Sequence, residues 1–309
     1  MARLFDTGNI IKCMVNEEDF SSFMFCTDIN DAGNRIYPDN EISDVLMNAL
    51  PEYVFANYEN ITNVNAMAKI REAAKALYNT EEYEAINKYY IYKDSSFKEK
   101  AEKHQSYSRG EFGEILLHIL LREFKETIPL VSKVYFKDSR GVPAHGFDAV
   151  HISPNDKILW LGESKLYTDG KEGVNALIKD LKEHFTRNYM NEQFTIIKKC
   201  VSNNSILDRD YWINRLSQNK KLTDMISHLS IPLLCVYSDE SYIKWLNEKI
   251  DDIATVLELN TRNLKLYFDQ RNDAPLKDFL NIVLFLMPVK DKHEFVVNVH
   301  KKLNLLQQL

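Results

Sequence analysis

The stretch that most constrains this chain is residues 145–165, which read HGFDAVHISPNDKILWLGESK. Residues 146–152 and 158–165 are rich in β-branched and aromatic side chains, and the PNDK sequence between them is typical of a turn. This pattern predicts a β-hairpin with a four-residue loop, in which Ser153 pairs with Ile158. Counting outward from that pair places Asp148 opposite Glu163.

Two acidic side chains and one lysine are expected on a single face of this hairpin. Because side chains alternate along a strand, Asp148, Glu163 and Lys165 should point the same way. Directly opposed residues have Cβ atoms about 5 Å apart, and two carboxylates that close repel unless one is protonated or a cation lies between them. Oxygen ligands around an open position suit Mg²⁺ or Mn²⁺. The hairpin therefore predicts a divalent-metal site.

Asp148 followed by Glu163-Ser164-Lys165 resembles the motif of PD-(D/E)xK nucleases, with Gly146-Phe147-Asp148 in place of the Pro-Asp half. The resemblance implies that the two acids hold a metal that activates water, and that the lysine positions this water or stabilises charge on the phosphate. It also implies a restriction-endonuclease-like core. The alternative is that Glu163 and Lys165 form only a surface ion pair, which contributes little to stability.

A helix precedes the hairpin, because residues 108–121 read SRGEFGEILLHILL. Ser108 suits the N-cap, and Glu111 stands where the second member of a capping box is found. PD-(D/E)xK nucleases often carry an acid on this helix, and Arg109-Gly110 followed by Glu114 resembles archaeal Holliday-junction resolvases. The resemblance implies Glu114 as a third acid and metal ligand, with Glu111 as the second candidate. The alternative is that both glutamates only cap the helix and favour its N-terminal dipole.

The segment after the hairpin, residues 174–189, has apolar residues at helical spacing and predicts an amphipathic helix. Lys171, Lys179 and Lys182 lie on or beside it and are candidates for contact with a DNA backbone. The alternative is an ordinary solvated face, on which these lysines pair with acids of the same helix.

Two histidines flank Asp148. His145 lies at the strand edge and is a secondary catalytic candidate, since histidine titrates near neutral pH. Strand alternation places His151 on the face opposite the acids, which predicts a buried structural histidine.

Strands alternating with helices through residues 130–290 predict an α/β fold with a mixed central sheet flanked by helices. Strands are expected at 130–136, 231–237 and 282–287, helices at 190–228 and 242–257, and a strand or helix at 293–306. Residues 1–104 predict a mainly helical N-terminal region, with small strands before residue 40, that serves as a docking or regulatory lobe. Residues 105–309 are expected to form the nuclease-like domain.

The composition limits the chemistry. A net charge of −6 argues against a broad basic face and favours a nuclease that relies on a partner to engage DNA. The four cysteines lack the spacing of a zinc site, so no zinc is expected. No P-loop is present, so no nucleotide is expected on this chain. The sequence shows neither a signal peptide nor an apolar run of membrane length, which predicts a cytoplasmic protein that does not enter membranes.

Three segments together, RGEFGEILLHILL, HGFDAVHI and LWLGESKLYTDG with the following helix ending KEHF, are similar to the HamA family, the nuclease subunits of bacterial Hachiman anti-phage systems. The resemblance implies a superfamily 2 helicase partner, HamB, that restrains the nuclease until aberrant or damaged DNA is sensed. It implies a Mg²⁺-dependent (or Mn²⁺-dependent) deoxyribonuclease that cuts with little sequence preference. The alternative is a catalytically inactive nuclease fold that acts as a DNA-sensing or docking module.

Overall fold

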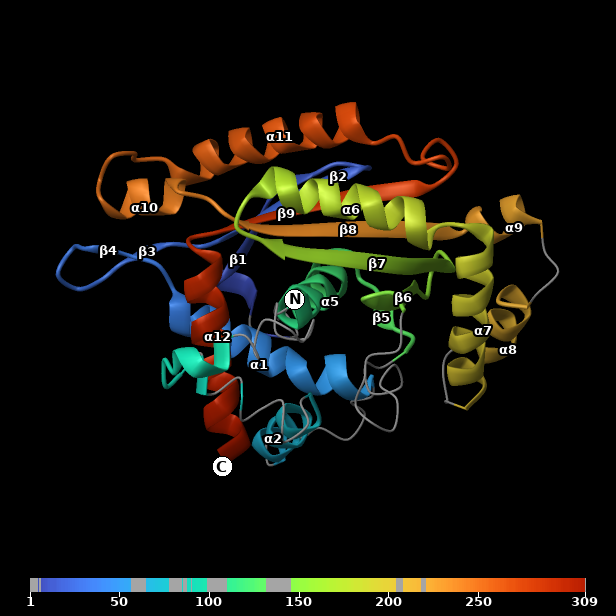
Figure 1. Ribbon diagram of the computed structural model, residues 1–309, viewed down its shortest axis with the longest axis horizontal. Helices are drawn as coiled ribbons and strands as arrows, with labels where there is room; N and C mark the ends of the chain where they lie inside the picture. The colour runs from blue at the N-terminus through green and yellow to red at the C-terminus, as the bar shows by residue number, and fades with distance from the viewer. Residues whose placement is uncertain are drawn as a thin grey trace.

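The protein has a mixed α/β fold, in which helices cover both faces of a curled seven-stranded sheet (Figure 1). The computed structural model describes residues 5, 7–56, 65–77, 85, 88–89, 91–98, 110–131, 146–203, 208–217 and 221–308. Among these residues, no helix has both the length and the apolar character that crossing a bilayer requires.

The sheet has the strand order β1-β2-β9-β8-β7-β6-β5. Its strands are β1 (Ile11–Asn16), β2 (Phe20–Phe25), β5 (Ile128–Pro129), β6 (Ala149–Ser153), β7 (Ile158–Tyr167), β8 (Leu229–Ser238) and β9 (Asn281–Val289). The four strands β2, β9, β8 and β7 run parallel to one another, whereas β1 pairs antiparallel with β2, β6 with β7, and β5 with β6. Strands β8 and β9 are nearly continuous apolar runs because helices bury them from both sides.

Two helical layers enclose the sheet (Figure 1). One apolar core lies between the sheet and the helices α1 (Asp39–Phe55), α2 (Ala66–Leu77), α5 (Gly110–Phe124) and α12 (Lys292–Gln308). The core on the opposite face is closed by α6 (Gly170–His184), α7 (Arg187–Asn203), α8 (Arg209–Arg215) and α11 (Ile253–Arg271). Strand β7 therefore presents alternate side chains to α5 and to α6.

The hairpin β6–β7 forms as predicted. Ser153 pairs with Ile158, and the ladder continues to Ala149 opposite Gly162, so the expected register is confirmed to that point; the predicted pair of Asp148 with Glu163 is not part of the ladder. Gly162 permits a close approach of α5, because a Cβ at this position would lie 2.8 Å from a methyl carbon of Leu117. Strand β7 is thus held in place by α5, which packs on one face of the sheet, as well as by its neighbouring strands.

The N-terminal region shares the sheet and core of the rest of the chain. Strand β2 pairs in parallel with β9, and α1 packs against α5 and α12. A small separate hairpin, β3 (Asp28–Ile29) with β4 (Arg35–Ile36), follows β2, so this region supplies strands as well as helices. The boundary expected at residues 104–105 lies outside the described residues.

The other expected elements are mostly confirmed. Strands β8 and β9 coincide with the predictions at 231–237 and 282–287, the 190–228 segment forms α7, α8 and α9 (Leu222–Ile226), and 293–306 lies within α12. The single helix predicted at 242–257 was wrong, because the chain forms α10 (Ser241–Leu246) and then restarts as α11 at an N-cap made by Asp252. Of the strand expected at 130–136, residues 132–136 lie outside the described part.

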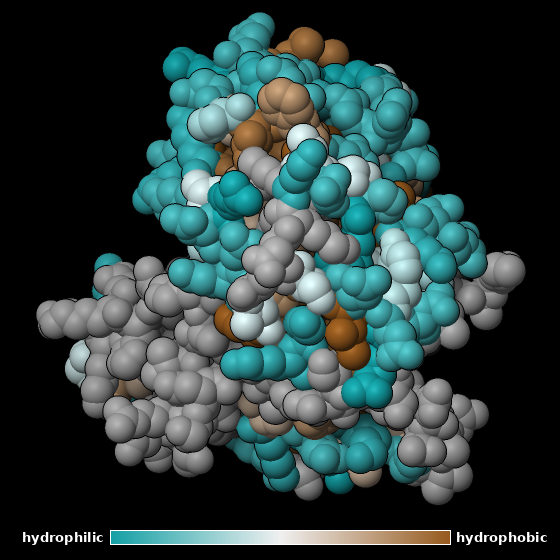
Figure 2. Space-filling view, turned by 90° about the vertical axis from the view of Figure 1, so that its right-hand side faces the viewer, coloured by the Kyte–Doolittle hydropathy of each residue, from teal (hydrophilic) through white to brown (hydrophobic). Residues whose placement is uncertain are grey.

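The side of the molecule that carries α7, α8 and α9 is mainly hydrophilic (Figure 2). Where its residues are described, the apolar ones form small separate areas. The C-terminal end of α6 lies toward this side (Figure 1).

Candidate metal and catalytic site

Strand β7 presents Glu163 and Lys165 to helix α6, in agreement with strand alternation. The carboxylate of Glu163 lies 2.6 Å from Nδ1 of His184, and the ammonium of Lys165 lies 2.5 Å from Oδ2 of Asp180. Ser164, between them in sequence, faces α5, since its Oγ lies 3.4 Å from the position a Cβ of Gly113 would take. The two motif residues therefore share one face and meet two side chains from a single helix.

Helix α6 positions Asp180 and His184 four residues apart, so they lie on the same side of the helix. The helix begins at an N-cap made by Asp169, whose carboxylate accepts from the backbone N–H of Glu172. One ligand atom each from Glu163, Asp180 and His184 lies within 4.8 Å of the others. Sequence reasoning missed this cluster, and treated Asp180 only as a partner for surface lysines.

The site carries titratable groups whose pKa values are raised. Glu163 is 2% exposed, and burial raises the pKa of its carboxyl against the opposing effect of His184. Burial lowers the pKa of His184, but the hydrogen bond and charge of Glu163 outweigh it and leave the pKa raised. Both shifts favour a proton held between these two side chains. The pKa of Lys165 is likewise raised, because Asp180, Asp148 and Glu163 outweigh its burial.

Asp148 lies just beyond the last ladder pair of the hairpin. Its Oδ2 accepts from the backbone N–H of Ser164 at 2.8 Å and from the Ser164 hydroxyl at 3.0 Å. The preceding Phe147 instead packs against Phe185 and Tyr189 on the α6 side. The carboxylate of Asp148 thus engages Ser164, while that of Glu163 engages His184. Both carboxylates nevertheless raise the pKa of the same residue, Lys165.

The two glutamates of α5 lie on the other side of β7. Glu114 accepts from the Tyr53 hydroxyl of α1 at 2.5 Å, and Glu111 is buried. Burial, followed by the charge of Glu114, raises the pKa of Tyr53, and Asp148 contributes in the same direction. The structure therefore groups Glu114 and Tyr53 with Asp148, and groups Glu163 with the residues of α6.

The three lysines proposed to contact DNA differ in their surroundings. Lys179 pairs with Glu183 of the same helix at 3.7 Å, as the solvated-face alternative expects, whereas Lys182 pairs at 2.5 Å with Asp273, which follows α11. The ammonium of Lys171 lies 5.4 Å from the ring centre of Tyr267. His145 lies outside the described residues.

His151 is a buried structural histidine, as predicted. Its Nδ1 lies 2.9 Å from the Thr127 hydroxyl, and its Nε2 lies 3.1 Å from Nδ1 of His118. This pair continues to Glu52, whose carboxylate lies 3.6 Å from Nε2 of His118 and is bound by Arg122. The network connects α1, α5 and β6 beneath the hairpin.

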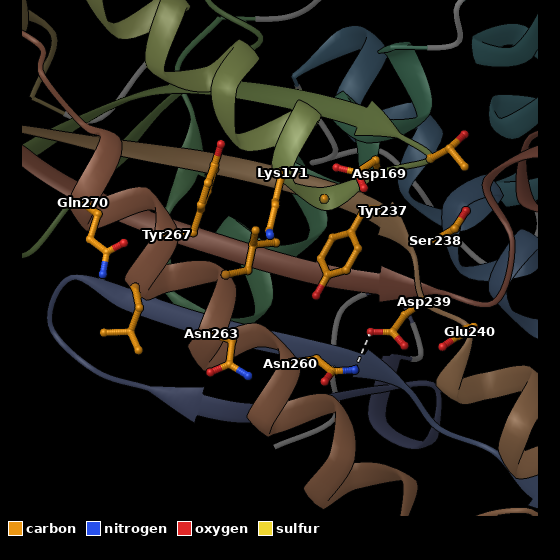
Figure 3. Close-up of a pocket in the computed structure, with 14 residues that line it drawn as sticks. Asp169, Lys171, Tyr237, Ser238, Asp239, Glu240, Asn260, Asn263, Tyr267 and Gln270 are labelled. Atoms are coloured by element: carbon orange, nitrogen blue, oxygen red, sulfur yellow. Dashed lines mark hydrogen bonds between the residues drawn. The ribbon is translucent and has the colours of Figure 1, made fainter.

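A cavity of about 810 Å³ lies at the N-terminal end of α6, the end away from His184, between that helix and α11 (Figure 3). Along α6, which rises about 1.5 Å per residue, the fourteen steps from Gly170 to His184 place that histidine roughly 20 Å from the cavity, whereas Lys165 lies only three residues before Thr168 of the cavity wall. Its acids have structural partners: Asp169 caps α6, and Asp239 accepts from the Ser241 backbone and from Asn260. The cavity is larger than the pocket of about 20 Å³ beside Asp148 and His151, but its residues lack the convergent ligand atoms that Glu163, Asp180 and His184 provide.

The donor set around Glu163 fits a divalent cation. Two carboxylates and one imidazole are ligands that Mn²⁺ and related ions accept, and oxygen ligands lie about 2.0–2.6 Å from such ions. Ligands on opposite sides of one ion are therefore roughly 4–5 Å apart, which is comparable to the 4.8 Å limit within which these atoms lie. Small side-chain adjustments would suffice to bind an ion.

Comparison with known proteins identifies the family of the chain. The sequence model of the HamA family matches residues 9–303, so the chain belongs to the HamA family. Membership of this family suggests a role in anti-phage defence, in the Hachiman system. A search of curated proteins gave no match.

Proposed function

We propose that this protein is a metal-dependent deoxyribonuclease of an anti-phage defence complex. The observation that carries the proposal is the placement of Glu163 and Lys165 side by side on the buried face of β7, next to Asp180 and His184. The order of a helix, a motif hairpin and a second helix supports a PD-(D/E)xK core. Family membership supports the defence role.

Each motif residue has a role that follows from its chemistry. Glu163 would hold a divalent ion, Mg²⁺ or Mn²⁺, with Asp148 as the second expected ligand; Glu114, on the other side of β7, would be a third acid near Asp148. The ion, when bound, lowers the pKa of a water and neutralises charge on the scissile phosphate. Lys165, kept protonated by its acidic neighbours, would position the attacking water or stabilise the phosphate charge. Burial of Glu163 strengthens these interactions, since water screens them less.

Cleavage of supercoiled plasmid and linear duplex DNA with Mg²⁺ or Mn²⁺ tests this proposal. Glu163→Gln and Lys165→Met should each abolish product formation while the circular dichroism spectrum stays native. Glu183→Gln is the control, because Glu183 is an exposed acid of α6, the helix that faces the motif residues. Undiminished cutting by both motif variants would refute the site.

A helicase partner is part of the proposal. The net charge of −6 supports a nuclease that depends on another protein to reach DNA. We expect the chain to co-purify with a superfamily 2 helicase, and cutting to rise when aberrant or damaged DNA and ATP are added to the complex. Cutting by the complex that is equal with intact and damaged DNA would contradict the proposed restraint.

The second candidate function is a DNA-sensing or docking subunit without catalysis. It is favoured by one observation: Glu163 and Lys165 have partners of opposite or titratable charge, and Asp148 accepts hydrogen bonds from Ser164, without an ion. Calorimetric titration with Mn²⁺ separates the two functions. A nuclease should bind the ion and lose this binding in Glu163→Gln, whereas a retired site should give no heat that depends on the motif.

A further inference from the structure

The immediate neighbours of Glu163 come from α6 and not from the preceding helix α5. His184 Nδ1 contacts its carboxylate directly, and Asp180 contributes to the same cluster. By contrast, Glu114 is bound by Tyr53, and Asp148 by Ser164. An ion held by Glu163 would therefore have Asp180 and His184 as its nearest further donors.

We propose that Asp180 and His184 are ligands of the divalent ion together with Glu163, and that this mixed oxygen and nitrogen set selects Mn²⁺ over Mg²⁺. The inference rests on the proposed function, and specifies which residues and which metal the site uses. Carboxylates bind Mg²⁺ and Mn²⁺ alike, whereas imidazole nitrogen is a ligand for transition ions that Mg²⁺ rarely takes.

The imidazole of His184 is oriented for this role by its surroundings. Its ring stacks on Tyr189, with ring centres 4.6 Å apart and planes 10° from parallel, and the ring of Phe147 lies at an angle of 86° to it. These contacts limit rotation of the ring, so that Nδ1 stays directed at Glu163. A ligand with a fixed orientation loses less entropy when it binds an ion.

The ion pair between Lys165 and Asp180 gives metal binding a second consequence. The Asp180 carboxylate is neutralised by the Lys165 ammonium 2.5 Å away. A divalent ion on Asp180 repels this ammonium and weakens the pair. Binding of the ion therefore releases Lys165 from α6 at the moment when its charge is needed at the phosphate.

Pulsed electron paramagnetic resonance of Mn²⁺ bound to the full chain tests the ligand assignment. We expect ¹⁴N modulation from a directly bound nitrogen, replaced by a ¹⁵N signal when the protein is made with ¹⁵N-labelled histidine. His184→Gln should remove the nitrogen signal and weaken Mn²⁺ binding about tenfold or more, with a smaller effect on Mg²⁺. Asp180→Asn should weaken Mn²⁺ binding similarly. The labelling experiment needs no variant, so it remains decisive if a substitution disturbs folding.

The controls separate the failure of this inference from that of the proposed function. His228→Ala removes an exposed imidazole bound to Arg215, and Glu183→Gln an exposed acid of α6, and both should leave the nitrogen signal unchanged. Mn²⁺ that requires Glu163 and Asp148 but shows no histidine nitrogen would overturn the inference and leave the nuclease proposal standing. An absence of both metal binding and DNA cleavage would overturn the two together.

Discussion

Replacing Arg122 with methionine should destabilise the fold strongly, because this guanidinium neutralises a carboxylate buried beneath the hairpin. Arg122 of α5 binds Glu52 of α1 through two nitrogens and donates to the Thr127 carbonyl at 2.5 Å. The Glu52 side chain is only 5% exposed. Removal of one member of a buried ion pair typically costs about 3–5 kcal/mol, since the other charge is left without compensation. We expect the free energy of unfolding to fall by about that amount in Arg122→Met.

The cost should depend on pH and on Glu52. Burial already raises the pKa of Glu52, and loss of Arg122 removes the interactions that lower it. A carboxyl whose folded pKa lies above its unfolded value contributes stability at low pH that is lost as the pH rises through the folded pKa. The deficit of Arg122→Met should therefore be smaller at pH 5 than at pH 8. The double variant Glu52→Gln/Arg122→Met should recover much of it.

Urea unfolding followed by tryptophan fluorescence measures these differences at both pH values. Arg262→Met is the matched control, because Arg262 pairs with Glu17 and Glu258 at the solvent-exposed surface and contributes little. The reasoning fails if Arg122→Met is no more costly than Arg262→Met, or if its deficit is the same at pH 5 and pH 8.

Three further predictions concern Gly173, the histidine pair and Cys235. A Cβ on Gly173 would lie 2.5 Å from Cys235 Sγ, so Gly173→Ala should lower the free energy of unfolding, measured by thermal melts, by about 1–3 kcal/mol. The double variant Gly173→Ala/Cys235→Ala should recover most of this stability, and no recovery would exclude the contact as the cause. Burial lowers the pKa of His118 to about 3 and that of His151 below its ordinary range, and a depressed histidine pKa gives stability that is lost as the pH falls below about 6.5. The loss should be about 1.4 kcal/mol per pH unit for each histidine, and a His118→Gln/His151→Gln variant that keeps the wild-type pH slope would contradict it. The buried Cys235 thiol, whose pKa burial raises, should react with a thiol reagent only after unfolding, and labelling of Cys235 in the native protein would refute this.

The sequence was most informative where local pattern and geometry coincide. The PNDK turn and the alternation around it were enough to predict the pairing of Ser153 with Ile158, because a four-residue loop fixes the register of a hairpin. The positions of Glu163 and Lys165 on one face follow from the same alternation. The displacement of Asp148 toward Ser164 could not be predicted, since it depends on how the strand bends once the ladder ends.

The contribution of α6 shows a different limit. Asp180 and His184 are spaced i, i+4 beside the apolar residues Leu177 and Leu181. This spacing indicates that Asp180 and His184 lie on the side of the helix that faces the sheet. Its meaning depended on where β7 lies relative to the helix, which the sequence does not state. Likewise, nothing local indicates that β2 pairs with β9, because more than 250 residues separate these strands.

The central position of β9 bears on the order in which the chain assembles during synthesis. This strand is made last of the seven, yet it lies between β8 and the N-terminal pair β1 and β2. Until residues 281–289 leave the ribosome, β2 has no place to dock on the motif half of the sheet. A nascent chain interrupted before that point would carry the motif hairpin but leave one side of β8 open, so translation must pass residue 289 before the seven strands can join in one sheet.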